Sequence, residues 1–418
     1  MPEASIITAI KARLCYNSRG QESIEVDVIT NEKYLGRASA PSGASKGMYE
    51  AISFPNNSVE DALKIFNENR SRFIGVDASD TKAIYDALRS IDDTQNYSIV
   101  GGSIAYAVSI AAIDSASKAL GEPIFRLISI DKRKEKEYKL PYPLGNVLGG
   151  GAHAGPSTPD IQEYLVVPIG AKSMLEAVRM NLRVHRMLRD VLEKKDRYFT
   201  YGRGDEGAWA PRASNMEALE DVEQACIEAG YSIGRDVALG LDFASSSLWN
   251  GNGYAYTRYG NTLSREEQLE FVSSLIRDYR LIYVEDPLHE EDFSGMAELT
   301  KRFNDVYITG DDLLVTNTSR LRTAVDYRAC NAAILKVNQA GSLYEALLFA
   351  REAERYGIRL ITSHRSGEST DAHIAHVAVA TGSKMIKAGV VGGERVAKIN
   401  ELIRIEELDI IDGMSTIV

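Results

Sequence analysis

The stretch VYITGDDLLVTNTSRLRTAVDYRACNAAILKVNQ, residues 306–339, contains the unit that decides the fold. It begins with an apolar run that ends at Asp311 and Asp312, continues through a helical pattern, and finishes in a second apolar run, AAILKVNQ. A strand, a helix and a strand in this order predict neighbouring parallel strands. Lys336 lies inside the second run, where a lysine is unusual unless it is paired. The simplest interpretation is a lysine near a strand end that reaches water.

The same alternation runs from about residue 140 to the end of the chain. Five further apolar runs are EYLVVPI, VALGLDFA, LIYVEDP, IRLITSH and KMIKAG, which begin at Glu163, Val237, Leu281, Ile358 and Lys384. Three helical patterns between them open with capping-box pairs, namely Ser173 with Glu176, Ser214 with Glu217, and Ser264 with Glu267. Such repetition favours an α/β fold with a closed parallel barrel and outer helices. An open doubly wound sheet is the alternative, weakened because no GxGxxG sequence opens a helix.

The first third of the chain has a different character. SIEVDVIT (23–30) alternates like a strand, and helical patterns follow over 58–73, 81–91 and 103–120. These patterns predict an α+β unit. The charged run at 131–139 precedes two prolines, so we place domains at residues 1–135 and 136–418. A solvated loop within one domain explains that composition equally well.

Composition excludes several classes of protein. The net charge of the 418-residue chain is −11, which argues against sequence-independent binding of nucleic acid. Three scattered cysteines without a CxxC pair predict neither a disulfide framework nor a thiolate zinc site. No apolar run is typical of a signal peptide or of a membrane span. We therefore expect a cytoplasmic protein that does not bind membranes.

Acidic residues end three consecutive apolar runs. Asp242 ends the first, Glu285 and Asp286 the second, and Asp311 and Asp312 the third. One such acid would usually cap the next helix. In a barrel, however, these strand ends meet at the face that carries active sites, where unpaired carboxylates would repel one another. A bound Mg²⁺, which prefers oxygen ligands, would resolve this repulsion.

Lys336 belongs to the strand that follows these acids. Residues two apart in a strand share a face, so Lys336 and Asn338 should point together, toward the predicted metal. A nearby cation such as Lys387 would lower the pKa of Lys336. The sequence thus predicts a neutral amine that acts as a general base.

Four loops add polar groups, although each alone is an ordinary turn or cap. GRGDEGAWAP (202–211) is glycine-rich and acidic, and GGGAHAG (149–155) contains His153. Gln162 and Glu163 precede an apolar run. The small-residue loop APSGASKGMYEA (40–51) has glycines suited to the hinges of a lid.

Taken together, these residues resemble the enolase family along nearly the whole chain, from NSRG (17–20) to LIRIEE (402–407). The most specific matches are PSGAS, GDEG, VEDP, GDDLLVTN, ILKVNQ and SHRSGES. The resemblance implies an α+β N-terminal domain followed by a modified TIM-like β/α barrel. It also implies a lyase that interconverts 2-phosphoglycerate with phosphoenolpyruvate and water.

The resemblance further implies a role for each matching residue. Two Mg²⁺ ions are expected per active site, the first on Asp242, Glu285 and Asp311, and the second, bound with substrate, on Ser45. Lys336 would take the C2 proton, and Glu206, with Glu163 beside it, would help the C3 hydroxyl leave. The substrate pocket would contain Arg365 and Ser366 at the phosphate, Lys387 at the carboxylate, and His153, Gln162 and His364. Enolases dimerise, so we expect at least a homodimer, with Glu25 and Arg404 near its interface.

The chain departs from the family pattern at Asn17, Lys46, Pro156, Ala208, Trp209 and Gly392, none of which is a proposed catalytic group. The changes at Lys46, Pro156 and Ala208 fall in loops and leave a paralogue with another substrate open. A dehydratase or racemase for an unphosphorylated acid is one alternative. Arg365 and Ser366 argue against it, because a guanidinium suits phosphate. A non-catalytic scaffold is the other alternative, opposed by the joint presence of metal ligands, acid and base.

Overall fold

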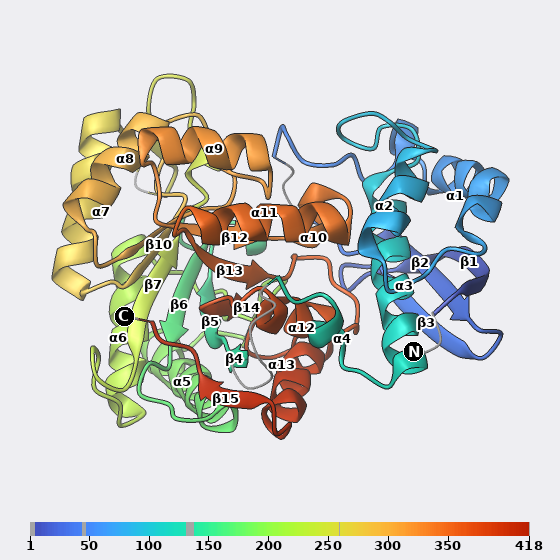
Figure 1. Cartoon of the computed structure of the whole chain (residues 1–418). Coiled ribbons are helices and arrows are strands. Elements are labelled where there is room, and N and C mark those ends of the chain that lie inside the picture. Colours follow the sequence, from blue (N-terminus) through green and yellow to red (C-terminus); the bar gives the residue numbers. More distant parts are fainter. Residues whose placement is uncertain (1–4, 44–46, 131–137, 259, 418) are drawn as a thin grey trace.

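The computed structural model describes residues 5–43, 47–130, 138–258 and 260–417. A smaller N-terminal unit lies beside a barrel that is surrounded by helices (Figure 1). The expected domain boundary at residues 135 and 136 falls outside the described residues. No described helix is both long and apolar enough to cross a membrane.

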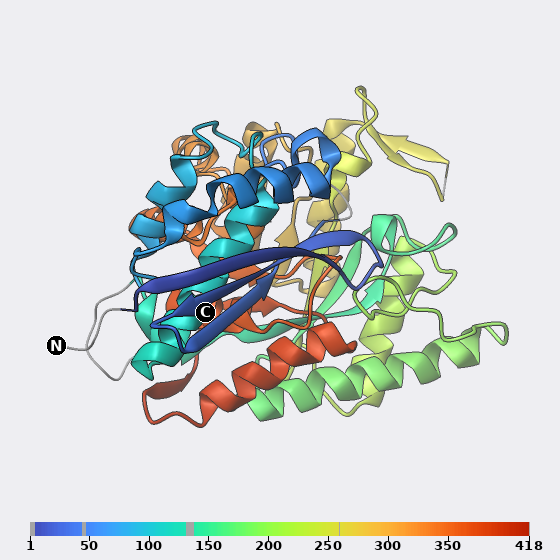
Figure 2. The ribbon, with the colours of Figure 1, turned by 90° about the vertical axis from the view of Figure 1, so that its right-hand side faces the viewer.

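The N-terminal unit is a three-stranded antiparallel sheet covered by helices, as the strand and helix patterns predict. Its strands are β1 (Ile7–Tyr16), β2 (Glu22–Thr30) and β3 (Tyr34–Ser39), and its helices are α1 (Val59–Asn69), α2 (Thr81–Arg89), α3 (Gly102–Leu120) and α4 (Ile124–Leu127). In Figure 2 the sheet lies in front of α3, which is buried along most of its length. Gly36 makes this close packing possible, because a Cβ there would lie 2.1 Å from the Ala111 carbonyl oxygen.

The barrel is closed by eight strands, which confirms the predicted barrel. They are β5 (Tyr142–Gly149), β6 (Glu163–Val167), β7 (Ala238–Asp242), β10 (Tyr283–Glu285), β11 (Tyr307–Gly310), β12 (Ala332–Leu335), β13 (Arg359–Ser363) and β14 (Met385–Lys387). The short β4 (Tyr138–Leu140) pairs with β15 (Ile411–Met414), and β8 (Tyr254–Tyr256) pairs with β9 (Asn261–Leu263).

Strand β6 runs against both of its neighbours, so the expectation of a wholly parallel sheet is wrong at this position. Glu163 is paired with Gly149 of β5 and with Asp242 of β7, both at the ends of their strands. The cause is the connection from β5 to β6, which contains only a short 3₁₀ turn at 151–153. Parallel neighbours need a long crossover, whereas a short loop joins antiparallel strands. The first residue of β6 therefore lies at the same barrel end as the last residues of the others.

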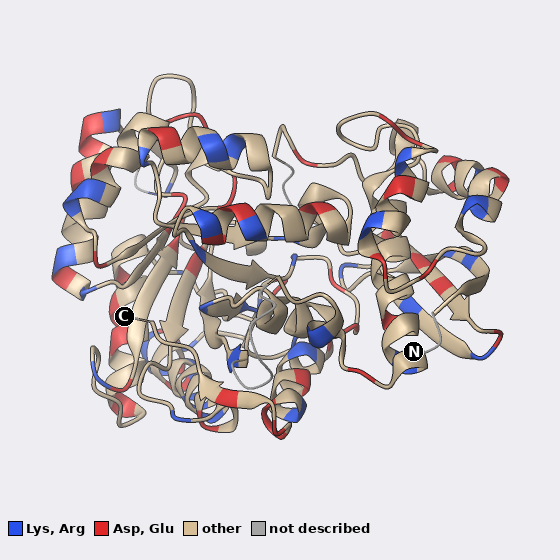
Figure 3. Ribbon diagram, viewed as in Figure 1, with Lys and Arg blue, Asp and Glu red and all other residues tan. Residues whose placement is uncertain are grey.

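Helices cover the outside of the barrel. They are α5 (Met174–Lys195), α6 (Asn215–Glu228), α7 (Arg265–Tyr279), α8 (Phe293–Arg302), α9 (Thr318–Tyr327), α11 (Leu343–Arg355), α12 (His373–Ala380) and α13 (Gly393–Glu406), whereas the short α10 (Val337–Ala340) lies at the mouth. The capping boxes at Ser214 and Ser264 are formed, whereas at Ser173 the Glu176 carboxylate accepts from the Lys172 amide instead. Acidic and basic residues are interspersed along α11 (Figure 3).

The N-terminal unit contacts the barrel where the strand ends meet. Ser42 and Gly367 exchange two backbone hydrogen bonds of 2.8 Å, and the Ala51 amide donates to the Gln339 carbonyl at 2.9 Å. Both ends of the small-residue loop at 40–51 are thus fixed to the mouth of the barrel.

Candidate active site

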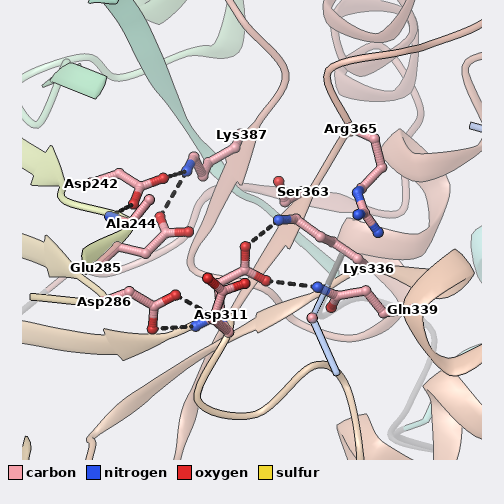
Figure 4. A network of polar contacts seen from close by, with 12 residues as sticks. Asp242, Ala244, Glu285, Asp286, Asp311, Lys336, Gln339, Ser363, Arg365 and Lys387 are labelled. Carbon is pink, nitrogen blue, oxygen red and sulfur yellow. Dashed lines mark hydrogen bonds and ion pairs between the residues drawn. The ribbon is translucent and has the colours of Figure 1, made fainter. Parts of the chain in front are cut away.

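The acids and lysines predicted from the strand ends meet at the mouth of the barrel (Figure 4). Asp242 and Glu285 end β7 and β10, Asp311 follows β11, and Lys387 ends β14. These four side chains are largely buried. The strand pattern placed them correctly because parallel strands deliver their last residues to one edge.

Lys336 reaches the same place by a different route from the one predicted. Strand β12 ends at Leu335, and Lys336 is the extended residue that precedes the short helix α10. Lys336 and Asn338 therefore do not share a strand face, contrary to the prediction. Lys336 Nζ donates to Asp311, while Asn338 accepts a hydrogen bond from Arg365 at 3.2 Å.

Lys387 lies at the centre of the buried charges. Its Nζ is 2.7 Å from Glu285 Oε2, 2.9 Å from Glu163 Oε2 and 3.0 Å from Asp242 Oδ2. Burial would lower the pKa of Lys387, but these carboxylates outweigh it and hold the pKa well above its usual value. Conversely, burial and the neighbouring Asp242 hold the pKa of Glu285 well above its usual range.

The predicted metal ligands offer donors of the right chemical type. Asp242, Glu285 and Asp311 supply carboxylate oxygens, and Glu285 Oε1 is buried without a hydrogen-bond partner among the described residues. An unpartnered buried carboxylate oxygen is costly unless a cation engages it. Lysines contact all three carboxylates here. Ser45, predicted to bind a second ion, lies outside the described residues.

Other side chains form tighter groups of possible ligands than this predicted set. Atoms of Asp286, Asp311 and Asp312 lie within 4.8 Å of one another, and so do atoms of His153, Glu163 and Glu206. Asp286 serves mainly to hold the turn after β11, because it accepts the amide protons of Asp311 at 3.0 Å and Asp312 at 2.6 Å.

The electrostatic prediction for Lys336 also needs correction. Burial, Arg365 and Lys387 all act to lower the pKa of Lys336, and the effect of Lys387 was predicted from the sequence. Asp311 and Glu285 act in the opposite direction and prevail, so the pKa of Lys336 is raised. In the absence of a metal and a substrate, Lys336 is thus a cation paired with Asp311.

A second cluster of charged side chains lies opposite the lysines. It includes Glu163 at the start of β6 and Glu206 in the loop between α5 and α6. His153 Nδ1 lies 3.4 Å from Glu163 Oε1 and 3.7 Å from Glu206 Oε1, and His364 Nε2 lies 3.2 Å from Glu206 Oε2. Burial and the Glu206 carboxylate raise the pKa of Glu163. Burial would raise the pKa of Glu206 too, but His364, His153 and Arg395 hold it well below its usual range. The pKa values of the two carboxyls are therefore shifted in opposite directions, upward for Glu163 and downward for Glu206.

The reversal of β6 explains how Glu206 arrives at the mouth. Because β6 runs away from the mouth, α5 runs back toward it, and the segment between α5 and α6 turns there. Asn146 on β5 donates to Glu206 Oε2 at 3.2 Å and fixes the carboxylate. GDEG thus lies in an interhelical loop, not in a loop that follows a strand.

His185 and Trp209, which sequence reasoning left without a role, clamp this loop to α5. Their rings stack with centroids 4.7 Å apart. The Trp209 indole donates to the His185 carbonyl at 2.7 Å, and His185 Nε2 donates to the Gly207 carbonyl at 3.0 Å. No short sequence pattern signals such a clamp.

Acidification is expected to destabilise the protein through His185. Burial lowers the pKa of His185 to about 4, whereas an unfolded histidine titrates near about 6.5. Between these values the unfolded state binds the additional proton, so the free energy of unfolding should fall by about 1.4 kcal/mol per pH unit of acidification. Urea unfolding from about pH 7 to about pH 4.5 should show a shallower pH dependence in His185→Gln than in wild type. Equal pH dependence in the two proteins would contradict this account.

The far side of the site contains Arg365 and Ser366. The Arg365 guanidinium pairs with Glu50 at 2.9 Å, and Ser366 Oγ is buried without a hydrogen-bond partner among the described residues. Gln162 Nε2 lies 3.4 Å from Asp242 Oδ2. A cavity at the mouth is lined by eleven of the predicted residues, namely His153, Gln162, Glu163, Glu206, Asp242, Asp311, Lys336, His364, Arg365, Ser366 and Lys387.

Sequence reasoning missed two further residues at this cavity. Glu50 comes from the small-residue loop and pairs with Arg365, and Gln339 donates to Asp311 at 3.0 Å and accepts from Thr316 at 2.8 Å. Both lie in quoted stretches, but only the fold brings them to the site. The predicted dimer is untested by a single chain, in which Glu25 accepts from Arg13 and Arg404 pairs with Glu401.

The fold and the site define a class of protein: barrel enzymes whose active site lies at the strand ends, beneath an N-terminal domain. Residues 7–128 match the family model for the enolase N-terminal domain, and residues 137–412 match that for the enolase C-terminal TIM barrel domain. The enolase of Methanothermobacter thermautotrophicus is 44% identical over 407 residues, covering 96% of this chain and 97% of the relative.

Two other relatives are similar to nearly the same extent. The enolase of Methanosphaera stadtmanae is 43% identical, covering 96% of this chain and 97% of its own, and that of Halorubrum lacusprofundi is 44% identical, covering 96% and 98%. The chain belongs to the enolase family.

Proposed function

We propose that the chain interconverts 2-phosphoglycerate with phosphoenolpyruvate and water. One observation carries this proposal: the buried Lys336, the carboxyl pair of Glu163 and Glu206, and Arg365 line the same cavity. Removal of a proton beside a carboxylate and departure of a neighbouring hydroxyl require a base and an acid at a single substrate. The cavity holds candidates for both.

Two Mg²⁺ ions are part of the proposal. Asp242, Glu285 and Asp311 would hold the first, and Ser45 would help to hold the second. When bound, the ions would supply positive charge that stabilises the second negative charge on the substrate carboxylate and opposes the charge on Lys336.

Lys336 is the proposed base for the C2 proton. Its amine is buried, and the backbone amide of Lys336 donates to Thr316 Oγ1 at 2.9 Å, which fixes the root of the side chain. To accept a proton the amine must first lose its own, so the bond to Asp311 has to weaken before the reaction. A base held in a fixed position needs little reorganisation during proton transfer.

Glu206 is the proposed acid for the C3 hydroxyl, with Glu163 beside it. The pKa of Glu163 is raised and that of Glu206 is lowered, so Glu163 binds a proton more readily than Glu206 does. His153 lies between the two carboxylates, within 3.4 Å of Glu163 and 3.7 Å of Glu206, and so offers a path by which that proton reaches Glu206. A base, Lys336, and a separate acid, Glu206, support a stepwise elimination.

The remaining groups would orient the substrate. Arg365 and Ser366 would bind the phosphate, for which a guanidinium offers paired donors, and Lys387 would bind the carboxylate. His153, Gln162 and His364 would complete the pocket. A substrate without phosphate would leave Ser366 Oγ unpartnered, which disfavours the alternative of an unphosphorylated acid. We further expect a cytoplasmic homodimer, with Glu25 and Arg404 near the interface.

Removal of divalent metal is expected to abolish the reaction. A chelator-treated sample should form phosphoenolpyruvate at least about 100-fold more slowly, because metal charge is worth several kcal/mol in such a step. The rise in ultraviolet absorbance of phosphoenolpyruvate measures the rate, and added Mg²⁺ should restore it. Unphosphorylated glycerate is the matched control substrate and should not react. A chain that shows no metal-dependent rise would not be an active enolase.

A further inference from the structure

Arg395, in the first turn of α13, is a buried cation outside the set of predicted site residues. Its side chain is fully buried. The guanidinium donates to Arg365 O at 2.6 Å, Ser366 O at 2.7 Å and Asp205 O at 3.0 Å. Its Nη1 also lies 2.8 Å from His364 Nδ1. One side chain thus ties the His364–Ser366 segment to the loop that carries Glu206.

Two glycines make room for this side chain. Gly389 and Gly392 have φ of +69° and +115°, a region that favours glycine. A Cβ at Gly389 would lie 3.1 Å from Arg395 Cγ, and one at Gly392 would lie 3.3 Å from the same atom. The backbone before α13 is therefore shaped around the stem of Arg395.

The contact with His364 determines which ring nitrogen carries the proton. A guanidinium can only donate hydrogen bonds, and it stays protonated throughout the working range of proteins. His364 Nδ1 must therefore accept, which leaves the proton of the neutral ring on Nε2. Nε2 lies 3.2 Å from Glu206 Oε2, and it forms no aligned hydrogen bond among the described residues, so its N–H is available to Glu206.

We propose that Arg395 is a positioning residue that fixes His364 as the neutral Nε2–H tautomer and thereby presents a fixed donor to Glu206. The proposal rests on the role proposed above for Glu206. A neutral N–H beside Glu206 can support its carboxylate without transferring a proton to it.

The charges around His364 agree with this arrangement. Burial lowers its pKa to about 4, with Arg395 acting in the same direction and with Glu206 and Glu368 opposing. At neutral pH the ring is thus uncharged, and its two nitrogens have different partners. The three hydrogen bonds to carbonyls would be enough for a purely structural arginine. The fourth contact, with His364 Nδ1, determines which nitrogen of the imidazole carries the proton.

The wild-type protein provides the first test, which does not depend on activity. Nitrogen NMR of protein with ¹⁵N-labelled histidine rings should show His364 as the Nε2–H tautomer from about pH 6 to about pH 8. The His364→Gln variant assigns the signal. An Nδ1–H tautomer, or an imidazolium in that range, would overturn the proposal even if the protein is an active enolase. The expected tautomer would support it even if the proposed reaction were not found.

Variants then test the function of the contact. Arg395→Met should raise the pKa of His364 toward about 6.5 and populate both tautomers. The kcat for elimination should fall by about 100-fold, a larger factor than the change in KM. The variant should also lose activity at acidic pH values at which the wild type is still active. Arg395→Lys keeps the charge and one donor, and should recover part of both effects.

Lys398→Met is the matched control, because Lys398 is an equally buried cation on the same helix. It donates to the carbonyls of Ser369, Asp371 and Glu394, pairs with Glu368 at 2.9 Å and, among the described residues, makes no hydrogen bond to His364. This variant should lose stability but keep the wild-type tautomer, because the Arg395 contact with His364 Nδ1 is unchanged. If Arg395→Met and Arg395→Lys changed stability alone, as Lys398→Met does, Arg395 would have only a structural role.

Discussion

Lys336→Ala is expected to abolish exchange of the C2 proton of 2-phosphoglycerate with solvent. The Lys336 amine is buried at the end of β12 and is the proposed base. Alanine has no group that could accept the proton. The rate should fall by about 10⁴-fold, the upper range for loss of a positioned base. Proton NMR in deuterated water measures the exchange directly, without requiring the elimination to occur.

Lys384→Ala provides the control for this variant. Lys384 is a half-buried lysine that precedes β14, at the opposite end of the strand from Lys387. Its removal should leave exchange near the wild-type rate. Mg²⁺ binding, followed by calorimetry, should survive in both variants, because Asp242, Glu285 and Asp311 are unchanged. Wild-type exchange in Lys336→Ala would show that another group is the base.

Glu206→Gln is expected to block formation of phosphoenolpyruvate while exchange of the C2 proton partly survives. Glutamine keeps the size of the side chain and can still contact Asn146 and His364, but it cannot deliver a proton to the departing hydroxyl. Elimination should fall by about 10³-fold, within the range for general acid catalysis. The ratio of deuterium exchange to phosphoenolpyruvate formation should therefore rise sharply.

Asp205→Asn is the matched control, because Asp205 is the neighbouring acid of the same loop and pairs with Arg19 instead of facing the cavity carboxylates. It should change the exchange ratio little. If exchange and elimination fell equally in Glu206→Gln, Glu206 would act before or during proton removal and the stepwise assignment would be wrong.

The sequence predicted the barrel and most of the cavity because both depend on local periodicity. Apolar runs that alternate with helical patterns require a sheet whose strand ends converge. Asp242, Glu285 and Asp311 were therefore found from their positions alone. The resemblance to enolases then added residues whose local pattern is uninformative, such as His153 and Ser366.

The features that the sequence did not predict depend on contacts between distant residues. The pairing of Glu50 with Arg365 and that of Arg395 with His364 join elements far apart in the chain. The pKa of Lys336 depends on the balance of several charges at short range, which no strand pattern contains. The end of β12 at Leu335 reflects the turn into α10, which an apolar run conceals.

The reversed strand β6 has a consequence for how this protein can change over time. In a regular barrel each loop at the mouth continues directly into an outer helix, so altering the loop disturbs a strand–helix pair. Here the segment at 150–162 joins two strands, and the one at 196–213 joins two helices. Changes in either segment can reshape the entrance without altering a direct strand-to-helix connection, although Trp209 also bonds to Val147 and Gly149 of β5. Pro156, Ala208 and Trp209, at which the chain departs from the enolase pattern, all lie in these two segments.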